Sequence, residues 1–185
     1  KVILASNSPR RKELLSGLGI CYEVKTLPGI EESYPDTLSG EEIPVFIACE
    51  KADAYRQTMH SDELIITADT IVWLDGLVMG KPEDEEDARR MLRCLSGKTH
   101  QVITGVCLTT TEFQKSFATV TDVTFAELTE EEIDYYVQKY KPMDKAGSYG
   151  IQEWIGFVGV EGITGSYFNV MGLPIQRLYK ELKKL

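Results

Sequence analysis

The feature that most constrains this chain is an alternation of short apolar runs with longer amphipathic segments. Short apolar or β-branched runs predict buried strands, and they occupy residues 2–5, 64–68, 71–74 with 77–79, 101–109 and 116–125. Between them lie segments with helical periodicity and capping residues, which predict helices starting near Pro9, Pro44, Glu83, Thr129 and Pro174. Strands that alternate with helices in this way predict an α/β fold with a central mixed sheet.

Length and charge limit the organisation and the partners. The 185 residues predict one domain, 1–185. Lys and Arg number 20 against 29 Asp and Glu, a formal net charge of −9, which is the wrong sign for a general phosphate-backbone binder. No apolar run approaches the 18 or so residues needed to span a bilayer. We therefore expect no nucleic-acid polymer and no membrane as partners.

The four cysteines are scattered without C-x-x-C spacing, and the two histidines are far apart in the chain. This pattern predicts small buried hydrophobes in a reducing compartment and argues against a structural zinc site. We expect a cytoplasmic protein.

The segment SNSPRR, residues 6–11, stands where the first strand turns into a helix capped by Ser8. A helix N-terminus exposes unpaired N–H groups and a partial positive charge, which attract anions. Arg10 and Arg11 add planar forks that suit phosphate oxygens, although two arginines oppose the dipole of their own helix. A capped helix with solvated arginines explains the same residues equally well.

Asp69 follows the apolar run 64–68, which places it near the carboxyl edge of the predicted sheet, where open α/β sheets bind ligands. There it could bind Mg²⁺ or act as a general base on water. An aspartate that caps the turn into Ile71 is the simpler explanation of this residue alone.

Several other side chains are candidates only in combination. Lys51, Lys81 and Lys145 are bordered by small or turn residues, yet each alone is typical of a solvated surface lysine. Glu31 and Glu32 form a pair of loop carboxylates that could bind a metal or face solvent. His100 is typical of a hydrogen-bonded structural histidine, and the acidic runs 83–87 and 130–134 are explained as helix starts.

Together, anion-binding Ser, Arg and Lys groups and acids able to hold a metal predict a phosphate ester or anhydride as ligand, with hydrolysis as the simplest reaction. No Walker loop, G-x-G-x-x-G, H-E-x-x-H or G-x-S-x-G motif is present.

The whole set of segments resembles the Maf-like nucleotide pyrophosphatases nearly from end to end. Any one motif is weak, but eight in the same order are specific. They are SNSPRRKELL (6–15), GIEES (29–33), EKA (50–52), ADTIV (68–72), GKP (80–82), SGKTHQVITGV (96–106), DKAGSYGIQ (144–152) and NVMGLP (169–174).

The resemblance implies an elongated, two-lobed α/β fold with a central mixed sheet flanked by helices and a cleft between the lobes. It implies hydrolysis of a nucleoside triphosphate to the monophosphate and pyrophosphate, a nucleotide-pool house-cleaning activity that uses a divalent cation, Mg²⁺ or Mn²⁺. The Y-G-I-Q segment is similar to the branch acting on dTTP and UTP. A homodimer is compatible with the sequence.

The same resemblance implies roles for particular residues. Asp69 corresponds to the proton acceptor. Positions of substrate specificity fall on Arg10, Thr70 and Gln152. The residues similar to phosphate-binding and metal-binding groups are Ser8, Arg11, Lys51, Lys81 and, for the metal, Glu32 together with Asp69.

Two other functions stay open at this point. The family takes its name from a cell-division phenotype, so the chain could be a nucleotide-binding regulator of septum formation without turnover. It could also have the 7-methyl-GTP-directed activity of a related branch. Gln152, without the resemblance, is best explained as a brace for the glycine-rich loop that follows it.

Overall fold

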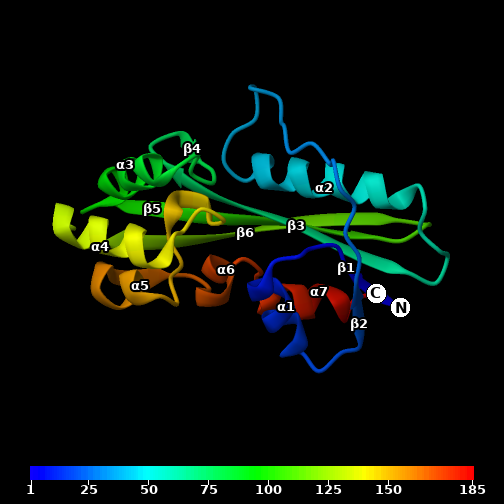
Figure 1. Ribbon diagram of the computed structural model, residues 1–185. Coiled ribbons are helices and arrows are strands. Elements are labelled where there is room, and N and C mark those ends of the chain that lie inside the picture. The colour runs from blue at the N-terminus through cyan, green and yellow to red at the C-terminus, as the bar shows by residue number, and fades with distance from the viewer. The chain divides into compact units, whose positions relative to one another are not determined.

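A computed structural model describes residues 1–185 and contains one seven-stranded mixed sheet with helices around it (Figure 1). The strand order is β2-β1-β3-β5-β6-β7, with β4 paired to β3. β1 pairs in parallel with β2 and β3, with Val2 opposite Tyr22 and Leu64, whereas β3–β4 and β6–β7 are antiparallel. The predicted α/β class and mixed sheet are confirmed.

The strands are β1 (Val2–Leu4), β2 (Tyr22–Val24), β3 (Leu64–Leu74), β4 (Leu77–Met79), β5 (Thr99–Thr109), β6 (Gln114–Phe125) and β7 (Val160–Thr164). The helices are α1 (Pro9–Ser16), α2 (Glu42–Arg56), α3 (Glu85–Leu95), α4 (Glu130–Tyr140), the 3₁₀ turn η1 (Ala146–Ser148), α5 (Trp154–Gly159), α6 (Tyr167–Met171) and α7 (Ile175–Leu182). None of these helices combines the length and the apolar character needed to cross a membrane.

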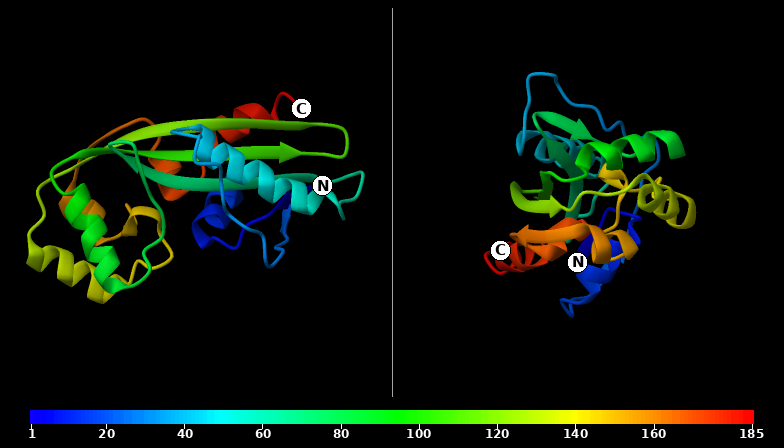
Figure 2. Two further views of the ribbon diagram at one scale, coloured as in Figure 1. Left: turned by 90° about the horizontal axis from the view of Figure 1, so that it is seen from above. Right: turned by 90° about the vertical axis from the view of Figure 1, so that its left-hand side faces the viewer.

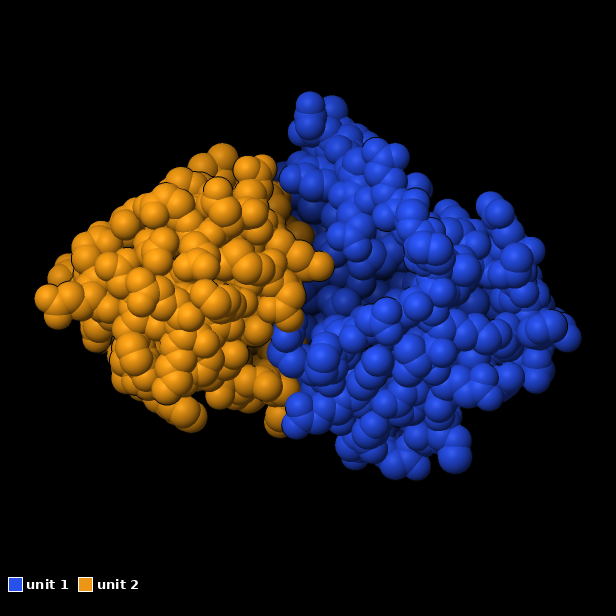
Figure 3. All heavy atoms as spheres, in the orientation of Figure 1, with its two compact units in different colours: residues 1–70, 103–119, 172–185 blue, residues 71–102, 120–171 orange.

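The chain divides into two compact units, drawn in blue and orange in Figure 3 and traced from two further sides in Figure 2. Unit 1 consists of residues 1–70, 103–119 and 172–185, and unit 2 of residues 71–102 and 120–171. Strands β3, β5 and β6 therefore contribute residues to both units.

In unit 1, α2 lies on one side of the strands, and α1 and α7 lie on the other (Figure 1). Gly105 in β5 permits the close packing of α2, because a Cβ atom there would lie 2.4 Å from the backbone of Pro44 and Val45. The Thr67 hydroxyl donates to the Ala48 carbonyl at 2.8 Å, which ties β3 to the same helix. The helix that carries Lys51 is therefore fixed against the sheet by direct backbone contact.

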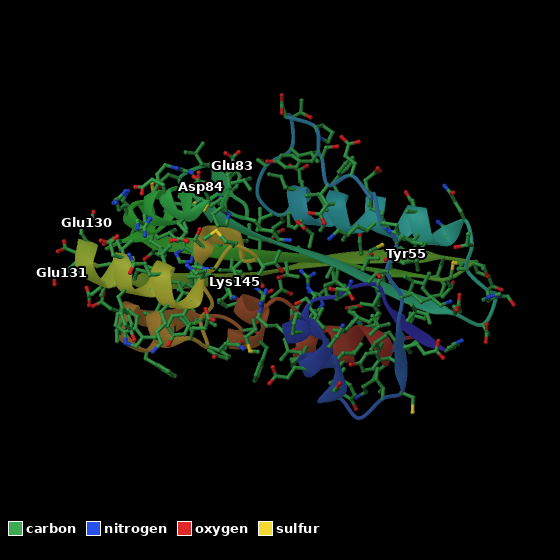
Figure 4. All side chains as sticks on the ribbon, in the orientation of Figure 1. Tyr55, Glu83, Asp84, Glu130, Glu131 and Lys145 are labelled. Atoms are coloured by element: carbon green, nitrogen blue, oxygen red, sulfur yellow. The ribbon has the colours of Figure 1, made fainter.

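In unit 2, the acidic segments start helices, as the sequence predicts. Figure 4 labels Glu83 and Asp84 at the start of α3, and Glu130 and Glu131 at the start of α4. The Asp84 carboxylate caps α3, and Thr129 forms a complete capping box for α4. These acids need no catalytic explanation.

Three sequence predictions are wrong. Strand β3 runs unbroken from Leu64 to Leu74, so Asp69 lies inside the strand and not at its end. The glycine-rich loop predicted after Gln152 is absent, because residues 154–164 form α5 and β7. At Gly156 a Cβ atom would meet the Ile151 carbonyl oxygen at 1.7 Å, so this glycine serves close packing and not flexibility. Only one of the four cysteines, Cys107, is buried, and Cys21 is exposed just before the edge strand β2.

Candidate functional site

The first motif forms the strand-to-helix turn that the sequence predicts. Pro9 begins α1, and the Ser8 hydroxyl accepts a hydrogen bond from the Arg11 N–H at 3.3 Å. The Ser8 N–H in turn donates to the Ser6 hydroxyl at 3.1 Å. Both serines are therefore held at the helix N-terminus, where orphan N–H groups favour an anion.

Arg11 is not the solvated arginine that the alternative explanation requires. Its Nε donates to the Gly172 carbonyl at 2.8 Å, and its Nη2 donates to the Thr70 hydroxyl at 3.1 Å. Burial lowers the pKa of Arg11 below its ordinary value, while the charges of Asp69 and Glu32 oppose that shift. The guanidinium therefore joins SNSPRR to ADTIV and to NVMGLP within unit 1.

The neighbouring Arg10 is half-buried on the same turn of α1. Burial is the largest cause of the lowered pKa of Arg11, and the opposing effect of Asp69 is the second largest. The positive charge of Arg10 is the third, and it lowers the pKa further. The two guanidinium groups thus concentrate positive charge at the N-terminus of α1.

Asp69 and Thr70 point to opposite faces of β3, as successive strand residues must. The Thr70 hydroxyl lies 2.9 Å from that of Thr104 and meets Arg11 of α1. Asp69 instead faces α2, with its Oδ1 3.8 Å from the Lys51 Nζ. These two contacts explain why the strand continues through two polar residues.

Lys51 connects three of the motifs. Its Nζ donates to the Ala68 carbonyl at 3.1 Å and lies 2.9 Å from Glu32 Oε1 as well as 3.8 Å from Asp69 Oδ1. The Lys51 and Asp69 side chains are 16% and 13% exposed, whereas Glu32 is 50% exposed. One ammonium group therefore lies between a buried and an exposed carboxylate.

The donor set fits a divalent cation that arrives with a phosphate ligand. The chain holds no group of three or more His, Cys, Asp or Glu side chains that could form a metal cage. Mg²⁺ needs only one or two carboxylates, because water and substrate phosphates complete its coordination. Glu32 and Asp69, both close to Lys51, are such a pair.

In unit 2, the GKP and DKAGSYGIQ motifs meet through the backbone. The Gly147 N–H donates to the Gly80 carbonyl at 3.1 Å. Gly147 and Ser148 both have left-handed φ angles, +69° and +65°, and a Cβ atom at Gly147 would lie 2.7 Å from a Val72 methyl group. Only glycine fits the first of these two positions.

Lys81 and Gln152, the candidate residues of unit 2, are both exposed. Lys145, labelled in Figure 4 on the segment after α4, is instead largely buried. Its Nζ lies 3.1 Å from Asp144 Oδ1 and 3.9 Å from Glu153 Oε2. Lys145 thus binds the acids on either side of the YGIQ segment.

His100 has the structural role that the sequence predicts. Its Nε2 is hydrogen-bonded to the Tyr149 hydroxyl at 2.5 Å, and its ring packs edge-on against Phe125. Burial lowers the pKa of His100 to about 4 and raises that of Tyr149. A neutral, buried imidazole therefore supports the residue that begins the YGIQ segment.

Sequence reasoning missed Thr104 and Gly172, which hold Thr70 and Arg11. It also missed Tyr136 and Glu153, which are hydrogen-bonded to each other beside the YGIQ segment. Thr104 and Gly172 lie inside motifs that carry the family resemblance, so the motif boundaries could have indicated them. Tyr136 lies on the buried face of α4, where periodicity indicates only packing.

The chain matches the family model described as Maf-like protein over residues 1–185. It is 82% identical over 185 residues to a protein of Phocaeicola vulgatus named dTTP/UTP pyrophosphatase, covering 100% of this chain and 96% of that protein. A protein of Bacteroides fragilis with the same name is 71% identical over 185 residues, with the same coverage of 100% and 96%.

Among solved structures, the chain is similar to a HAM1 protein from Coxiella burnetii. The TM-score is 0.52 at 14% identity, and the match covers 100% of this chain and 98% of that one. At this identity the similarity shows the fold alone.

Proposed function

The chain belongs to the Maf-like protein family, and from that premise we propose that it is a dTTP/UTP pyrophosphatase. In this reaction a water oxygen attacks the α-phosphorus of the nucleoside triphosphate. The bond from that phosphorus to the bridging oxygen breaks, which yields the nucleoside monophosphate and pyrophosphate. Within the molecule, the observation that carries the proposal is the cluster of Lys51, Glu32 and Asp69 beside the half-buried Arg11.

Asp69 is the proposed proton acceptor for the attacking water. A general base must lie within reach of the proton that it removes, and the buried carboxylate of Asp69 is held in β3 opposite Lys51. Attraction between these opposite charges keeps the carboxylate on the α2 side of the sheet. The proton from water would pass to Asp69 as the new oxygen–phosphorus bond forms.

Ser8, Arg11, Lys51 and Lys81 are the proposed phosphate ligands. A guanidinium has five N–H donors, and Arg11 uses one on Nε and one on Nη2 for Gly172 and Thr70. The remaining donors can bind phosphate while those two bonds hold the side chain in place. A preorganised cation of this kind stabilises the charge that develops on departing pyrophosphate.

Glu32 and Asp69 are the proposed ligands of a divalent cation, Mg²⁺ or Mn²⁺. When bound, such a cation neutralises phosphate charge and so improves pyrophosphate as a leaving group. Lys51 contacts both carboxylates, so its ammonium group would lie beside the phosphates whose charge the cation neutralises.

Gln152 is the proposed reader of the base, with Arg10 and Thr70 as further specificity positions. A uracil or thymine edge has two carbonyl acceptors around an N3–H donor, and one neutral amide can donate to O4 while it accepts from N3–H. Cytosine reverses that pattern and would leave groups unpaired on both sides. Thr70 would act through Arg11, to which its hydroxyl is bound.

The expectations on domain organisation, shape, location and oligomeric state remain predictions. A single working domain over residues 1–185 is supported by the span of the family model and by three strands that contribute to both units. The two-lobed shape with a cleft, the cytoplasmic location and the homodimer stay predictions from the sequence and its resemblance.

The test is pyrophosphate release from a panel of dTTP, UTP, CTP, dCTP, purine triphosphates and 7-methyl-GTP. We expect strong preference for dTTP and UTP, which should react within tenfold of each other because a methyl group is worth only about 1 kcal/mol. Nucleotide binding without pyrophosphate release would instead indicate a regulator. A preference for 7-methyl-GTP would indicate the related branch.

A further inference from the structure

One buried hydroxyl holds both ends of the turn that carries Gln152. The Tyr136 side chain on α4 is fully buried, and its hydroxyl accepts the Gly150 N–H at 2.9 Å. The same hydroxyl donates to Glu153 Oε1 at 2.5 Å. The Glu153 N–H closes the turn by donating to the Gly150 carbonyl at 3.0 Å.

We propose that Tyr136 is a positioning residue for pyrimidine selectivity, acting through Gln152. The proposal rests on the proposed function, in which the Gln152 amide reads the base. Tyr136 itself is buried and does not touch the substrate. It fixes the backbone two residues before Gln152 and the side chain one residue after it.

The hydroxyl is not needed to fill the core, because a phenylalanine ring would occupy almost the same space. Its two hydrogen bonds both go to the turn around Gln152. The ring is also held in place, since it stacks on Tyr140 with centroids 5.1 Å apart and planes 23° apart. A fixed ring gives the hydroxyl a fixed position from which to orient the turn.

The Glu153 carboxylate, which accepts from the Tyr136 hydroxyl through one oxygen, is held through its other oxygen by Lys145. Lys145 Nζ lies 3.9 Å from Glu153 Oε2, so the carboxylate lies between the ammonium and the phenol. A Cβ atom at Gly150 would come within 2.8 Å of Glu153 Oε1 and of the Lys145 side chain. Glycine at position 150 therefore leaves room for the Glu153 and Lys145 side chains where they lie.

Selectivity needs this precision because the Gln152 amide must donate and accept at the same base edge. Reading groups on a loop tolerate only small errors of position before discrimination is lost. Gln152 is itself exposed, so its backbone is what the protein can fix in advance. Loss of the hydroxyl should therefore reduce selectivity more than it reduces turnover.

The test compares Tyr136→Phe with the wild type in the full-length enzyme. We expect the UTP-to-CTP ratio of kcat/KM to fall about tenfold, mainly through a higher KM for UTP, with kcat for UTP changed less than threefold. Hydrogen exchange at the Gly150 amide should accelerate, because that amide loses its acceptor. An unchanged ratio would overturn the proposal, even where exchange at this amide accelerates.

Two controls separate positioning from general destabilisation. Tyr140→Phe keeps the stacked ring and should leave the ratio unchanged. Val137→Ala removes buried methyl groups from the same helix and should lower Tm without changing the ratio. A ratio that falls equally in Val137→Ala and in Tyr136→Phe would show that any loosening of α4 suffices, which also overturns the proposal.

Gln152→Glu, measured in parallel, separates this proposal from the proposed function. If the wild type is selective and Gln152→Glu is not, the base reader is established, and a selective Tyr136→Phe enzyme then contradicts the positioning role alone. If the wild type does not prefer UTP over CTP, the proposed function fails first, and the positioning role fails with it.

Discussion

The candidate residues of unit 1 and those of unit 2 are held in place by different forces. In unit 1, Arg11, Lys51, Asp69 and Glu32 lie close together, and their charges are matched within a few ångströms. In unit 2, Gln152 is exposed on a turn whose backbone is fixed by the neutral hydroxyl of Tyr136.

The contrast indicates how the two groups should respond to substitution. Charged groups that are paired in advance can stabilise a reacting phosphate without reorganisation, so changes at Arg11, Lys51 or Asp69 should affect all substrates alike. An exposed amide on a fixed turn can recognise only one pattern of donors and acceptors, so changes at Gln152 should alter the choice of base. Four predictions test this division.

The largest effect is expected at Asp69. Asp69→Asn removes the proton acceptor but is nearly isosteric, so kcat should fall by about 10²- to 10⁴-fold while the fold survives. The fall should be equal for dTTP and UTP, because the base is not involved. Steady-state kinetics and circular dichroism would measure the two parts of this prediction.

Asp53→Asn is the matched control, since Asp53 is an exposed aspartate two residues after Lys51 on α2. It should keep native turnover. Recovery of Asp69→Asn at high Mg²⁺ would reassign Asp69 as a metal ligand only. Near-native turnover at ordinary Mg²⁺ would remove it from the mechanism.

The next largest effect is expected at Gln152. A carboxylate cannot donate to O4, so Gln152→Glu should reduce the UTP-to-CTP ratio of kcat/KM by about a hundredfold or more. Turnover at saturating UTP should change far less, which would separate unit 2 from unit 1. A variant that keeps the wild-type ratio would show that another group reads the base.

How far the sequence alone could predict these regions depends on the range of the interactions. Local signals were sufficient for the start of α1 at Pro9 and for the capping box at Thr129, because the partners lie within one turn. The length of β3 was not predictable, because two polar residues, Asp69 and Thr70, are typical of a strand end. Their partners Lys51 and Arg11 are distant in the sequence and are identified only in the structure.

The same limit explains what was missed in unit 2. Tyr136 follows the apolar periodicity of α4, and nothing local distinguishes a packing ring from a hydroxyl with two distant partners. Glycines at 156, 159, 162 and 165 are typical of loops, yet they lie within or next to α5 and β7. The motif residues themselves were identified by resemblance, whereas the contacts that hold them required the structure.

An effect of about 2 kcal/mol is expected from acid acting on unit 2. Burial lowers the pKa of His100 from 6.5 to about 4. Between these values the unfolded chain binds more protons than the folded one, so stability is highest above pH 6.5 and decreases as the pH falls toward 4. At pH 5 the loss should be about 2 kcal/mol, since each pH unit within that window is worth about 1.4 kcal/mol.

Urea unfolding at pH 7 and pH 5 would measure this loss. His100→Gln cannot titrate, so its stability should decrease by about 2 kcal/mol less than that of the wild type over the same interval. His60→Gln, at the other histidine, which is exposed, should follow the wild type. Equal pH dependence in all three proteins would show that His100 is not neutral and buried in the folded state.

The smallest effect is expected at Lys81, and it is best measured against Arg11. Lys81 is exposed, so Lys81→Ala should leave the free energy of unfolding within about 0.5 kcal/mol of the wild type. The loss of one phosphate contact should weaken binding of a non-hydrolysable dTTP analogue about tenfold, and dTMP less. Arg11→Ala should weaken the same binding and also cost about 1–3 kcal/mol of stability, because the Gly172 carbonyl and the Thr70 hydroxyl lose their donor. Calorimetric titration with both nucleotides, alongside urea unfolding, would separate the two residues.

Equal weakening for dTTP analogue and dTMP in Lys81→Ala would mean that Lys81 does not contact the β- or γ-phosphate. An Arg11→Ala protein as stable as the wild type would mean that Arg11 binds ligand without supporting the fold. The contrast between the hydrogen-bonded Arg11 of unit 1 and the exposed Lys81 of unit 2 would then not hold.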